Sequence, residues 1–235
     1  ADYAMTMIQN ENLLTYNFNI KEAHNFELMA GMTYNRDLAL SLSGSAMGGP
    51  TNQITYIGEG WPKLRTNEYG TVESLQSVLS NKEEQAMQSF LGRFTYNYRQ
   101  RYLTEFSIRT DGSSVFGRDV RWGTFPAAGL GWVFSEEQFL KDFWWMNFGK
   151  LRASWGRSGQ KFQEPYLALG VMAEANTFFG NLGLIPTFMA NNKLTWEKSD
   201  QYDLGLDFYL LDSRLRFKFD YYYKYSDALL MQTPL

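Results

Sequence analysis

The sequence contains no cysteine, which excludes disulfide bonds and thiolate-based metal or catalytic sites. It also has no run of about 18 consecutive apolar residues, so a transmembrane helix is excluded. Basic residues are not in excess, because 22 Lys and Arg stand against 25 Asp and Glu and the net charge is −3. We therefore expect no nucleic-acid partner.

Catalytic and targeting motifs are missing as well. The first ten residues lack a basic segment followed by an apolar core, so we expect no signal peptide in this chain. We find no phosphate loop, zinc-ligand spacing or nucleophile elbow, and Ser45 stands in the wrong place for the last of these. The one histidine, His24, lies in a short polar segment and is interpreted as a solvated turn residue. We expect no enzyme activity, no cofactor and no metal.

Aromatic residues are abundant, at 17% of the chain, while the charged fraction of 20% is ordinary. Apolar and polar residues alternate over most of the sequence, which is typical of strands with one apolar and one polar face. The clearest example is LGRFTYNYRQRYLTEFSIRTD, residues 91–111. Only short stretches, such as 74–84 and 135–143, are candidates for helices. The sequence predicts an all-β antiparallel fold.

The connections between these strands alternate in length. Further strands are predicted at 15–20, 26–34, 128–134, 150–155, 202–210 and 214–224. Three connections are short, at 21–25, at Gln100 and at 211–213, and a fourth, at 135–145, is compact. Three others are longer, at about 42–84, 111–121 and 158–195. In an up-and-down sheet, alternate connections lie at opposite ends. One end therefore carries long loops and the other short turns, which is typical of an outer-membrane β-barrel.

Alternation alone does not say which face is wet. A soluble sandwich buries its apolar face, whereas a membrane barrel turns that face to lipid and keeps the polar face inside. Many of the predicted strands are longer than the usual 5–6 residues or so of globular sheets. Aromatic residues also gather near strand ends, as the interfacial girdles of barrels do; they include Tyr34, Tyr96, Tyr98, Trp144, Trp145, Tyr221 and Tyr223. These features favour the barrel over a soluble carbohydrate-binding β-sandwich or another soluble β protein.

Three blocks of the sequence resemble one known family. They are 101–142 (RYLTEFSIRTDGSSVFGRDVRWGTFPAAGLGWVFSEEQFLKD), 151–160 (LRASWGRSGQ) and 194–235 (LTWEKSDQYDLGLDFYLLDSRLRFKFDYYYKYSDALLMQTPL). In this order they resemble the SusC/RagA-type TonB-dependent outer-membrane transporters of Bacteroidota. The first 85 residues fit as barrel hairpins with a long variable loop.

The resemblance implies an up-and-down transmembrane barrel of about 22 strands, of the plugged outer-membrane transporter type. It also implies an N-terminal plug domain within the barrel, a SusD-like lid lipoprotein above it, and energy delivered through TonB. The substrate would be an oligosaccharide or a peptide, and the location the bacterial outer membrane. About nine strands are visible. Residues 1–235 are therefore expected to be a partial barrel domain without plug domain, TonB box or final strands.

One polar set follows the inward-facing positions of the predicted strands. Its members are Arg93, Arg99, Glu105, Arg109, Lys150, Arg152, Asp203, Asp207, Arg214, Arg216, Lys218 and Asp220. An Arg or Lys facing lipid at mid-membrane costs about 2–4 kcal/mol, so we expect these side chains to face the lumen. There they would contact the plug or the substrate.

The long loops supply a second set of candidates. Aromatic side chains there would stack on ligand or contact the lid, or simply pack the loops together; they are Trp61, Tyr69, Phe162, Tyr166, Phe178 and Phe179. Residues 110–114, TDGSS, suggest either a tight turn or a cation site built on Asp111 and Asp119. A passive porin-like barrel remains the alternative within the membrane.

Overall fold

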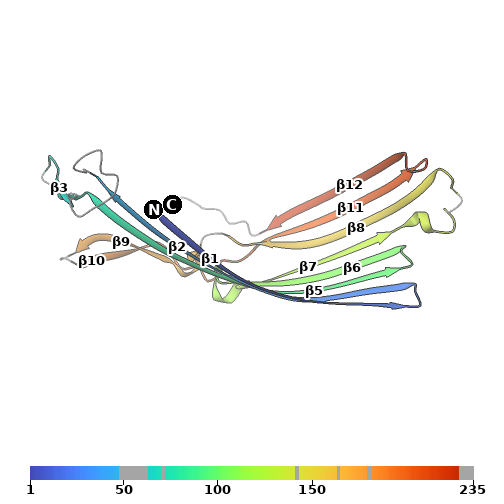
Figure 1. Cartoon of the computed structure of the whole chain (residues 1–235), viewed down its shortest axis with the longest axis horizontal. Helices are drawn as coiled ribbons and strands as arrows, with labels where there is room; N and C mark the ends of the chain where they lie inside the picture. The colour runs from blue at the N-terminus through green and yellow to red at the C-terminus, as the bar shows by residue number, and fades with distance from the viewer. Residues whose placement is uncertain (48–62, 70–71, 141–142, 163–164, 179–180, 228–235) are drawn as a thin grey trace. The chain divides into compact units, whose positions relative to one another are not determined.

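The structure is a computed structural model that describes residues 1–47, 63–69, 72–140, 143–162, 165–178 and 181–227. Its main feature is an eight-stranded antiparallel sheet with the order β1-β2-β5-β6-β7-β8-β11-β12 (Figure 1). The strands are β1 (Asp2–Ile20), β2 (His24–Ala46), β5 (Gln76–Tyr98), β6 (Tyr102–Ser113), β7 (Trp122–Trp132), β8 (Met146–Gln160), β11 (Glu197–Leu210) and β12 (Leu215–Asp227). The predicted all-β antiparallel fold is confirmed, and the sheet is open, with edges at β1 and β12.

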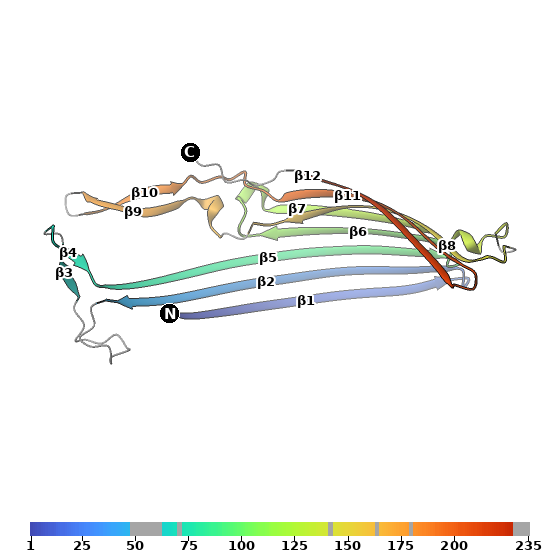
Figure 2. The ribbon, with the colours of Figure 1, turned by 90° about the horizontal axis from the view of Figure 1, so that it is seen from above.

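The remaining elements are small and lie in the connections. Two hairpins pair β3 (Leu64–Thr66) with β4 (Val72–Ser74) and β9 (Val171–Phe178) with β10 (Asn181–Phe188) (Figure 2). Three single-turn 3-10 helices are η1 (Arg118–Val120), η2 (Phe134–Glu136) and η3 (Leu167–Leu169). Among the residues that the structure describes, no helix has the length and apolar character needed to span a membrane.

The chain divides into two compact units. The first comprises Ala1–Ile8 and Arg36–Gln85, and it holds the β3–β4 hairpin together with parts of β1, β2 and β5. The second comprises Gln9–Asn35 and Ala86–Leu235 and contains all other elements. The candidate functional residues of the strands all belong to the second unit.

Strands β2 and β5 extend further than the sequence predicts. Residues 74–84, considered a candidate helix, lie mostly in β5, and the long connection shrinks to the segment between Ala46 and β5. The reason is cross-strand pairing, which overrides a weak local preference. In the first unit the amide of Met47 donates to the carbonyl of Leu75 at 2.9 Å, and Arg36 Nη2 lies 2.7 Å from Glu84 Oε1. Residues 135–143 likewise form no α-helix in their described part.

The predicted short connections are confirmed, and they share an unusual backbone conformation. Positive φ values occur at Lys21 and Glu22, at Arg99 and Gln100, and at 211–213. Left-handed residues at both central positions define the type I′ turn, whose twist matches that of the flanking strands. None of these residues is Gly or Asn, so the local sequence signal for such turns is missing and each turn is imposed by its strands.

His24 does not behave as predicted. It begins β2, is half-buried, and its Nδ1 lies 2.9 Å from the Tyr96 hydroxyl. Its ring also stacks with those of Tyr96 and Phe26. The interpretation of His24 as a solvated turn residue is therefore wrong, because a neighbouring strand that is distant in sequence covers it.

A small core lies where the β6–β7 connection meets the segment that precedes β11. Its buried members are Val115, Phe116, Phe125 and Trp196, with Met87 and Phe162 packed against them. The Trp196 indole donates to the carbonyl of Arg121 at 3.2 Å. Gly117 sits against the backbone of Asn192 so closely that a Cβ atom would collide with its carbonyl. The two connections are thus held together by packing and by main-chain contact.

The tight turn suggested for residues 110–114 is not observed. Asp111 and Gly112 lie within β6, paired with Gly123 and Trp122 of β7, so they form no turn. Asp111 is buried and accepts two hydrogen bonds from the Arg109 Nε, at 2.7 and 3.0 Å. No group of carboxylates or histidines suited to a metal ion is found among the described residues.

The β7–β8 connection carries a carboxylate with several donors. Glu137 Oε1 accepts hydrogen bonds from the Tyr102 hydroxyl at 2.6 Å and from the Trp132 indole at 3.2 Å. Arg101 Nη1 lies 3.7 Å from its other oxygen. The hydrogen bonds from Tyr102 and Trp132, followed by the charge of Arg101, lower the pKa of the Glu137 carboxyl below its usual value of 4.5.

Removal of the Trp196 side chain is expected to destabilise the full-length protein by about 3–5 kcal/mol, because this indole is 2% exposed and fills the core. The thermal unfolding midpoint of Trp196→Ala checks this. Tyr69→Ala serves as the control, since Tyr69 is 84% exposed; its effect is expected within about 0.5 kcal/mol. Equal midpoints for the two variants would contradict the assignment of Trp196 to a core.

Glu137 is expected to make stability depend on pH. Because its pKa is lowered in the folded state, its contribution is present above about pH 4.5 and is lost as the pH falls through the folded-state value. Unfolding midpoints of the wild type and Glu137→Gln are measured from pH 7 to pH 3. The gap between them should be largest at neutral pH and narrow in acid. A gap that does not change with pH would refute the ionised role of Glu137.

Candidate functional site

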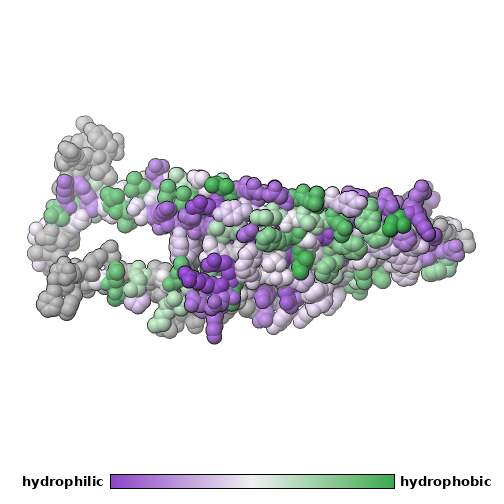
Figure 3. Space-filling view, turned by 90° about the horizontal axis from the view of Figure 1, so that it is seen from below, coloured by the Kyte–Doolittle hydropathy of each residue, from purple (hydrophilic) through white to green (hydrophobic). Residues whose placement is uncertain are grey.

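The register of the sheet separates an apolar face from a charged face. On β11 the apolar side chains are Tyr202, Leu204, Leu206, Phe208 and Leu210. Their partners on β12 are Tyr223, Tyr221, Phe219, Phe217 and Leu215. The same positions on β8 include Trp155, Ala153 and Leu151. Figure 3 shows apolar side chains gathered on one face of the molecule, with hydrophilic side chains around them.

The apolar face has the height that a membrane requires. From Tyr202 to Leu210 the strand rises about 26 Å, close to the apolar band of about 25 Å on outer-membrane barrels, which strand tilt reduces somewhat. Beyond Tyr202, the next position on this face is Asp200, which forms a two-pronged ion pair with Arg157 of β8 at 2.9 Å for each bond. The apolar band thus ends at an aromatic pair, followed by a neutralised charge pair.

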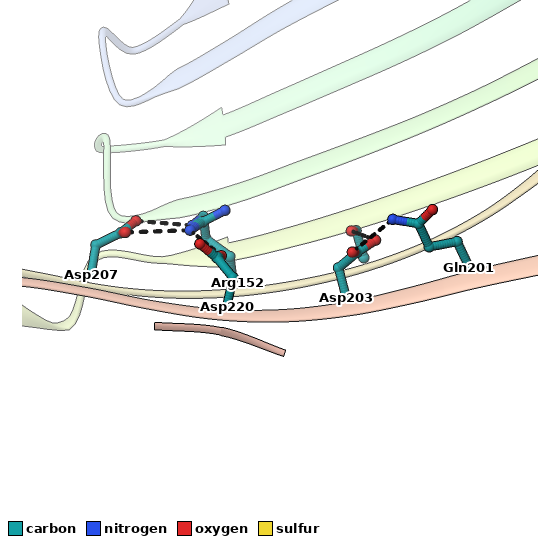
Figure 4. Close-up of polar contacts among 6 residues, drawn as sticks. Arg152, Gln201, Asp203, Asp207 and Asp220 are labelled. Atoms are coloured by element: carbon teal, nitrogen blue, oxygen red, sulfur yellow. Dashed lines mark hydrogen bonds and ion pairs between the residues drawn. The ribbon is translucent and has the colours of Figure 1, made fainter. Parts of the chain in front are cut away.

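Arg152 of β8 is the centre of the charged face. Its Nε donates to Asp207 Oδ2 at 2.9 Å, and its Nη2 donates to Asp207 Oδ1 at 3.3 Å and to Asp220 Oδ1 at 2.8 Å (Figure 4). One guanidinium therefore joins three neighbouring strands, since Asp207 lies on β11 and Asp220 on β12. Hydrogen bonds between ionised groups are roughly twice as strong as neutral ones.

Gly205 makes this arrangement possible. It stands directly opposite Arg152 on one side and Asp220 on the other. A Cβ atom at residue 205 would lie 2.7 Å from Arg152 Nη2 and 2.8 Å from Asp220 Oδ1. The guanidinium consequently crosses β11 over a position where no side chain fits.

Further ion pairs follow the same face across the sheet. Arg93 Nη2 lies 2.7 Å from Glu27 Oε1, linking β5 to β2. Arg109 holds Asp111 two residues along β6, and its Nη2 also donates to Ser89 Oγ at 3.2 Å. Three arginines of the charged face, Arg93, Arg109 and Arg152, are therefore paired with carboxylates within the sheet.

A shallow groove of about 430 Å³ lies on this face, over β6, β7, β8 and β11. Small residues line much of it, among them Ser107, Ala127, Gly129, Ser154, Gly156 and Ser158. The carboxylates of Glu105 and Asp203 also line it. Asp203 accepts hydrogen bonds from Gln201 and Ser154, and neither carboxylate forms an ion pair with another described residue (Figure 4).

Most of the predicted inward-facing set shares one face in the observed register. This holds for Arg93, Glu105, Arg109, Lys150, Arg152, Asp203, Asp207, Arg216, Lys218 and Asp220. Arg99 instead lies in the tight turn after β5, with its guanidinium 5.3 Å from the centre of the Tyr98 ring, and Arg214 lies in the turn before β12. Arg216 covers the ring of Tyr209 at 5.4 Å. That this common face is a lumen remains a prediction.

The predicted loop aromatics that the structure describes belong to different elements. Phe162 packs edge-on against Phe116 at 5.0 Å and belongs to the small core. Tyr69 is exposed in the first unit, and Tyr166, with φ of 66°, precedes η3. Phe178 ends β9, whereas Trp61 and Phe179 lie outside the described residues.

Sequence reasoning missed Glu27, Gly205 and Gln201 on the charged face. Alternate residues of a strand face the same side, and Glu27 stands between the apolar Phe26 and Leu28, so the sequence could have placed Glu27 on the polar face. Gly205 carries a clearer one, because it stands between two aspartates at inward positions. The arrangement offers a polar wall with several paired charges, and the described residues hold no group of carboxylates or histidines suited to a metal ion.

Comparison with known proteins supports a single family. Residues 2–235 match the model of the TonB dependent receptor-like β-barrel. The chain is 35% identical to TonB-dependent receptor P3 of Formosa agariphila over 229 residues, which is 96% of this chain and 22% of that protein. It is 33% identical to the TonB-dependent receptor SusC of Bacteroides thetaiotaomicron over 180 residues, or 74% of this chain and 18% of that protein.

The fold agrees with a solved transporter. The structure of the RagAB peptide transporter matches with a TM-score of 0.86 at 24% identity, covering 99% of this chain and 25% of that one. The chain therefore spans about a fifth to a quarter of the length of the proteins it matches. The eight-stranded open sheet corresponds to part of a barrel wall, and the chain belongs to the TonB-dependent receptor β-barrel family.

Proposed function

We propose that these residues form part of the barrel of an outer-membrane transporter that imports a nutrient actively. The observation that carries the proposal is the separation of faces: a lipid-compatible apolar band on one side and a paired, charged surface on the other, in a sheet of this family. The relatives are TonB-dependent receptors and transporters, which supports import across the outer membrane driven through TonB.

The charged face would line the barrel interior. Several of its charges are paired within the sheet, which suits a wall against which a plug domain rests and past which a polar solute moves. These contacts would be made by the side chains of the predicted inward-facing set that share this face, namely Arg93, Glu105, Arg109, Lys150, Arg152, Asp203, Asp207, Arg216 and Lys218. The unpaired carboxylates of Glu105 and Asp203 would favour a basic group from the plug or substrate.

The partners follow from the relatives. SusC-like and RagA-like proteins support a SusD-like lipoprotein lid and energy transfer from TonB through a region outside residues 1–235. The plug domain would likewise be supplied outside this chain segment. The substrate would be an oligosaccharide or a peptide, and Tyr69, Tyr166 and the other predicted loop aromatics would contact it or the lid.

Uptake assays on the host strain test the function. Deletion of the gene for the full-length protein should abolish uptake of one labelled oligosaccharide or peptide class, and collapse of the proton gradient with an uncoupler should abolish it in the wild type. Uptake that persists after uncoupling would indicate a passive porin-like barrel. Unchanged uptake of all such compounds in the deletion strain would refute a role in nutrient import.

Arg152 should matter more for transport than an equivalent pair on the other face. Arg152→Met leaves Asp207 and Asp220 without their cation and alters the barrel interior, so uptake at equal surface abundance should fall several-fold. Arg157→Met removes a similar two-pronged pair at the edge of the apolar face and is the matched control, with uptake expected near wild type. Arg152→Lys should recover part of the loss. Equal uptake in Arg152→Met and Arg157→Met would contradict the interior assignment.

A further inference from the structure

The groove on the charged face crosses four neighbouring strands. One row of its lining residues stands in direct cross-strand register: Glu105 of β6, Gly129 of β7, Ser154 of β8 and Asp203 of β11. A carboxylate therefore stands at each end of the row. The two residues between them are small, so they leave open the space that larger side chains would fill.

The next row, toward the end of the sheet that carries the long loops, keeps the groove open. Ser107, Ala127, Gly156 and Gln201 stand opposite one another on the same four strands, and all of them line the groove. Three of these residues are small and none is charged. The two rows together leave a trough that lies across the strands, with its acidic groups only at the two ends of one row.

Neither carboxylate is matched by a cation among the residues that the structure describes. Asp203 accepts hydrogen bonds only from neutral groups, Gln201 Nε2 at 2.9 Å and Ser154 Oγ at 3.4 Å (Figure 4). Glu105 has no hydrogen bond or ion pair with a described residue. Lys224 stands opposite Gln201 but bonds to neither carboxylate. The negative charges at both ends of the row are thus available to a ligand.

The arginines beside the groove are already paired. Arg157 also lines the groove, but its Nε and Nη2 both donate to Asp200, at 2.9 Å each. Arg152, one row away, is held by Asp207 and Asp220. Because these guanidiniums are engaged elsewhere, a ligand that satisfies the groove must bring its own cationic groups.

The separation of the two carboxylates matches an extended peptide. Neighbouring strands lie about 4.8 Å apart, so the backbones of Glu105 and Asp203 are about 14 Å apart across three strand spacings. In an extended chain, residues i and i+4 project to the same side and are also about 14 Å apart. Residues i and i+2 are only about 7 Å apart, and residues i and i+3 project to opposite sides.

We propose that this groove binds an extended peptide that carries two basic side chains four residues apart, one over Glu105 and the other over Asp203. A neutral oligosaccharide offers neither carboxylate a charge to pair with. Exposed ion pairs are individually weak, so the site would hold a passing peptide only briefly, as import requires. The inference rests on the proposed function and narrows its substrate to basic peptides.

Binding of two synthetic peptide isomers to the purified full-length protein in detergent tests the site. Both isomers are fluorescently labelled, capped at their ends and built from Ala and Ser with two Lys residues. The lysines are four residues apart in one isomer and two residues apart in the other. Fluorescence anisotropy gives the Kd of each isomer for the wild type, Glu105→Gln and Asp203→Asn. Glu11→Gln is the matched control, since it removes an exposed carboxylate of β1 outside the groove.

The isomer with lysines four residues apart is expected to bind several-fold more tightly to the wild type and to Glu11→Gln, and each groove variant should lose this preference. Equal Kd values for the two isomers in the wild type would overturn the site, whereas uptake that depends on the proton gradient would still support the transporter. A preference that survives in both groove variants would also overturn it. Equal Kd values together with a lower thermal unfolding midpoint for both groove variants would assign the carboxylates to contact with the plug instead.

Discussion

The structure depends on strand register. A shift of one residue would exchange the two faces of a strand, and in the proposed membrane setting every backbone group must also bond within the sheet. If the apolar face meets lipid as proposed, such a shift in β8 or β11 would turn Arg152 or Asp207 toward lipid, and an Arg or Lys at mid-membrane costs about 2–4 kcal/mol. The ion pairs on the charged face therefore also specify alignment, because Arg152 reaches two acids only when three strands are correctly placed.

The two ends of the sheet solve different problems. At the long-loop end, Phe116, Phe125 and Trp196 build a small core that binds separate connections to each other. At the opposite end, left-handed turns such as that at Arg99 and Gln100 reverse the chain in the least space. Rigid connections at one end and packed loops at the other suit the proposed role of a fixed wall past which a solute moves.

Much of this arrangement could be predicted from the sequence, because alternation is a local property. The strands, their two faces and the alternating connection lengths follow from residue order alone. His24, Asp111 and residues 74–84 could not be placed, since each is governed by a strand distant in sequence. The alternation of residues along each strand is enough to assign a side chain to the charged face. The ion pairs between side chains on that face depend on the register between strands, which only the folded sheet supplies.

Gly205 gives the charged face a particular sensitivity. Conservative substitutions on a strand usually alter packing and leave the charges where they are. At residue 205 a single added carbon would occupy the path by which the Arg152 guanidinium crosses to Asp220. Even the smallest added side chain at residue 205 would therefore change the charge distribution, because it would separate the Arg152 guanidinium from the Asp220 carboxylate.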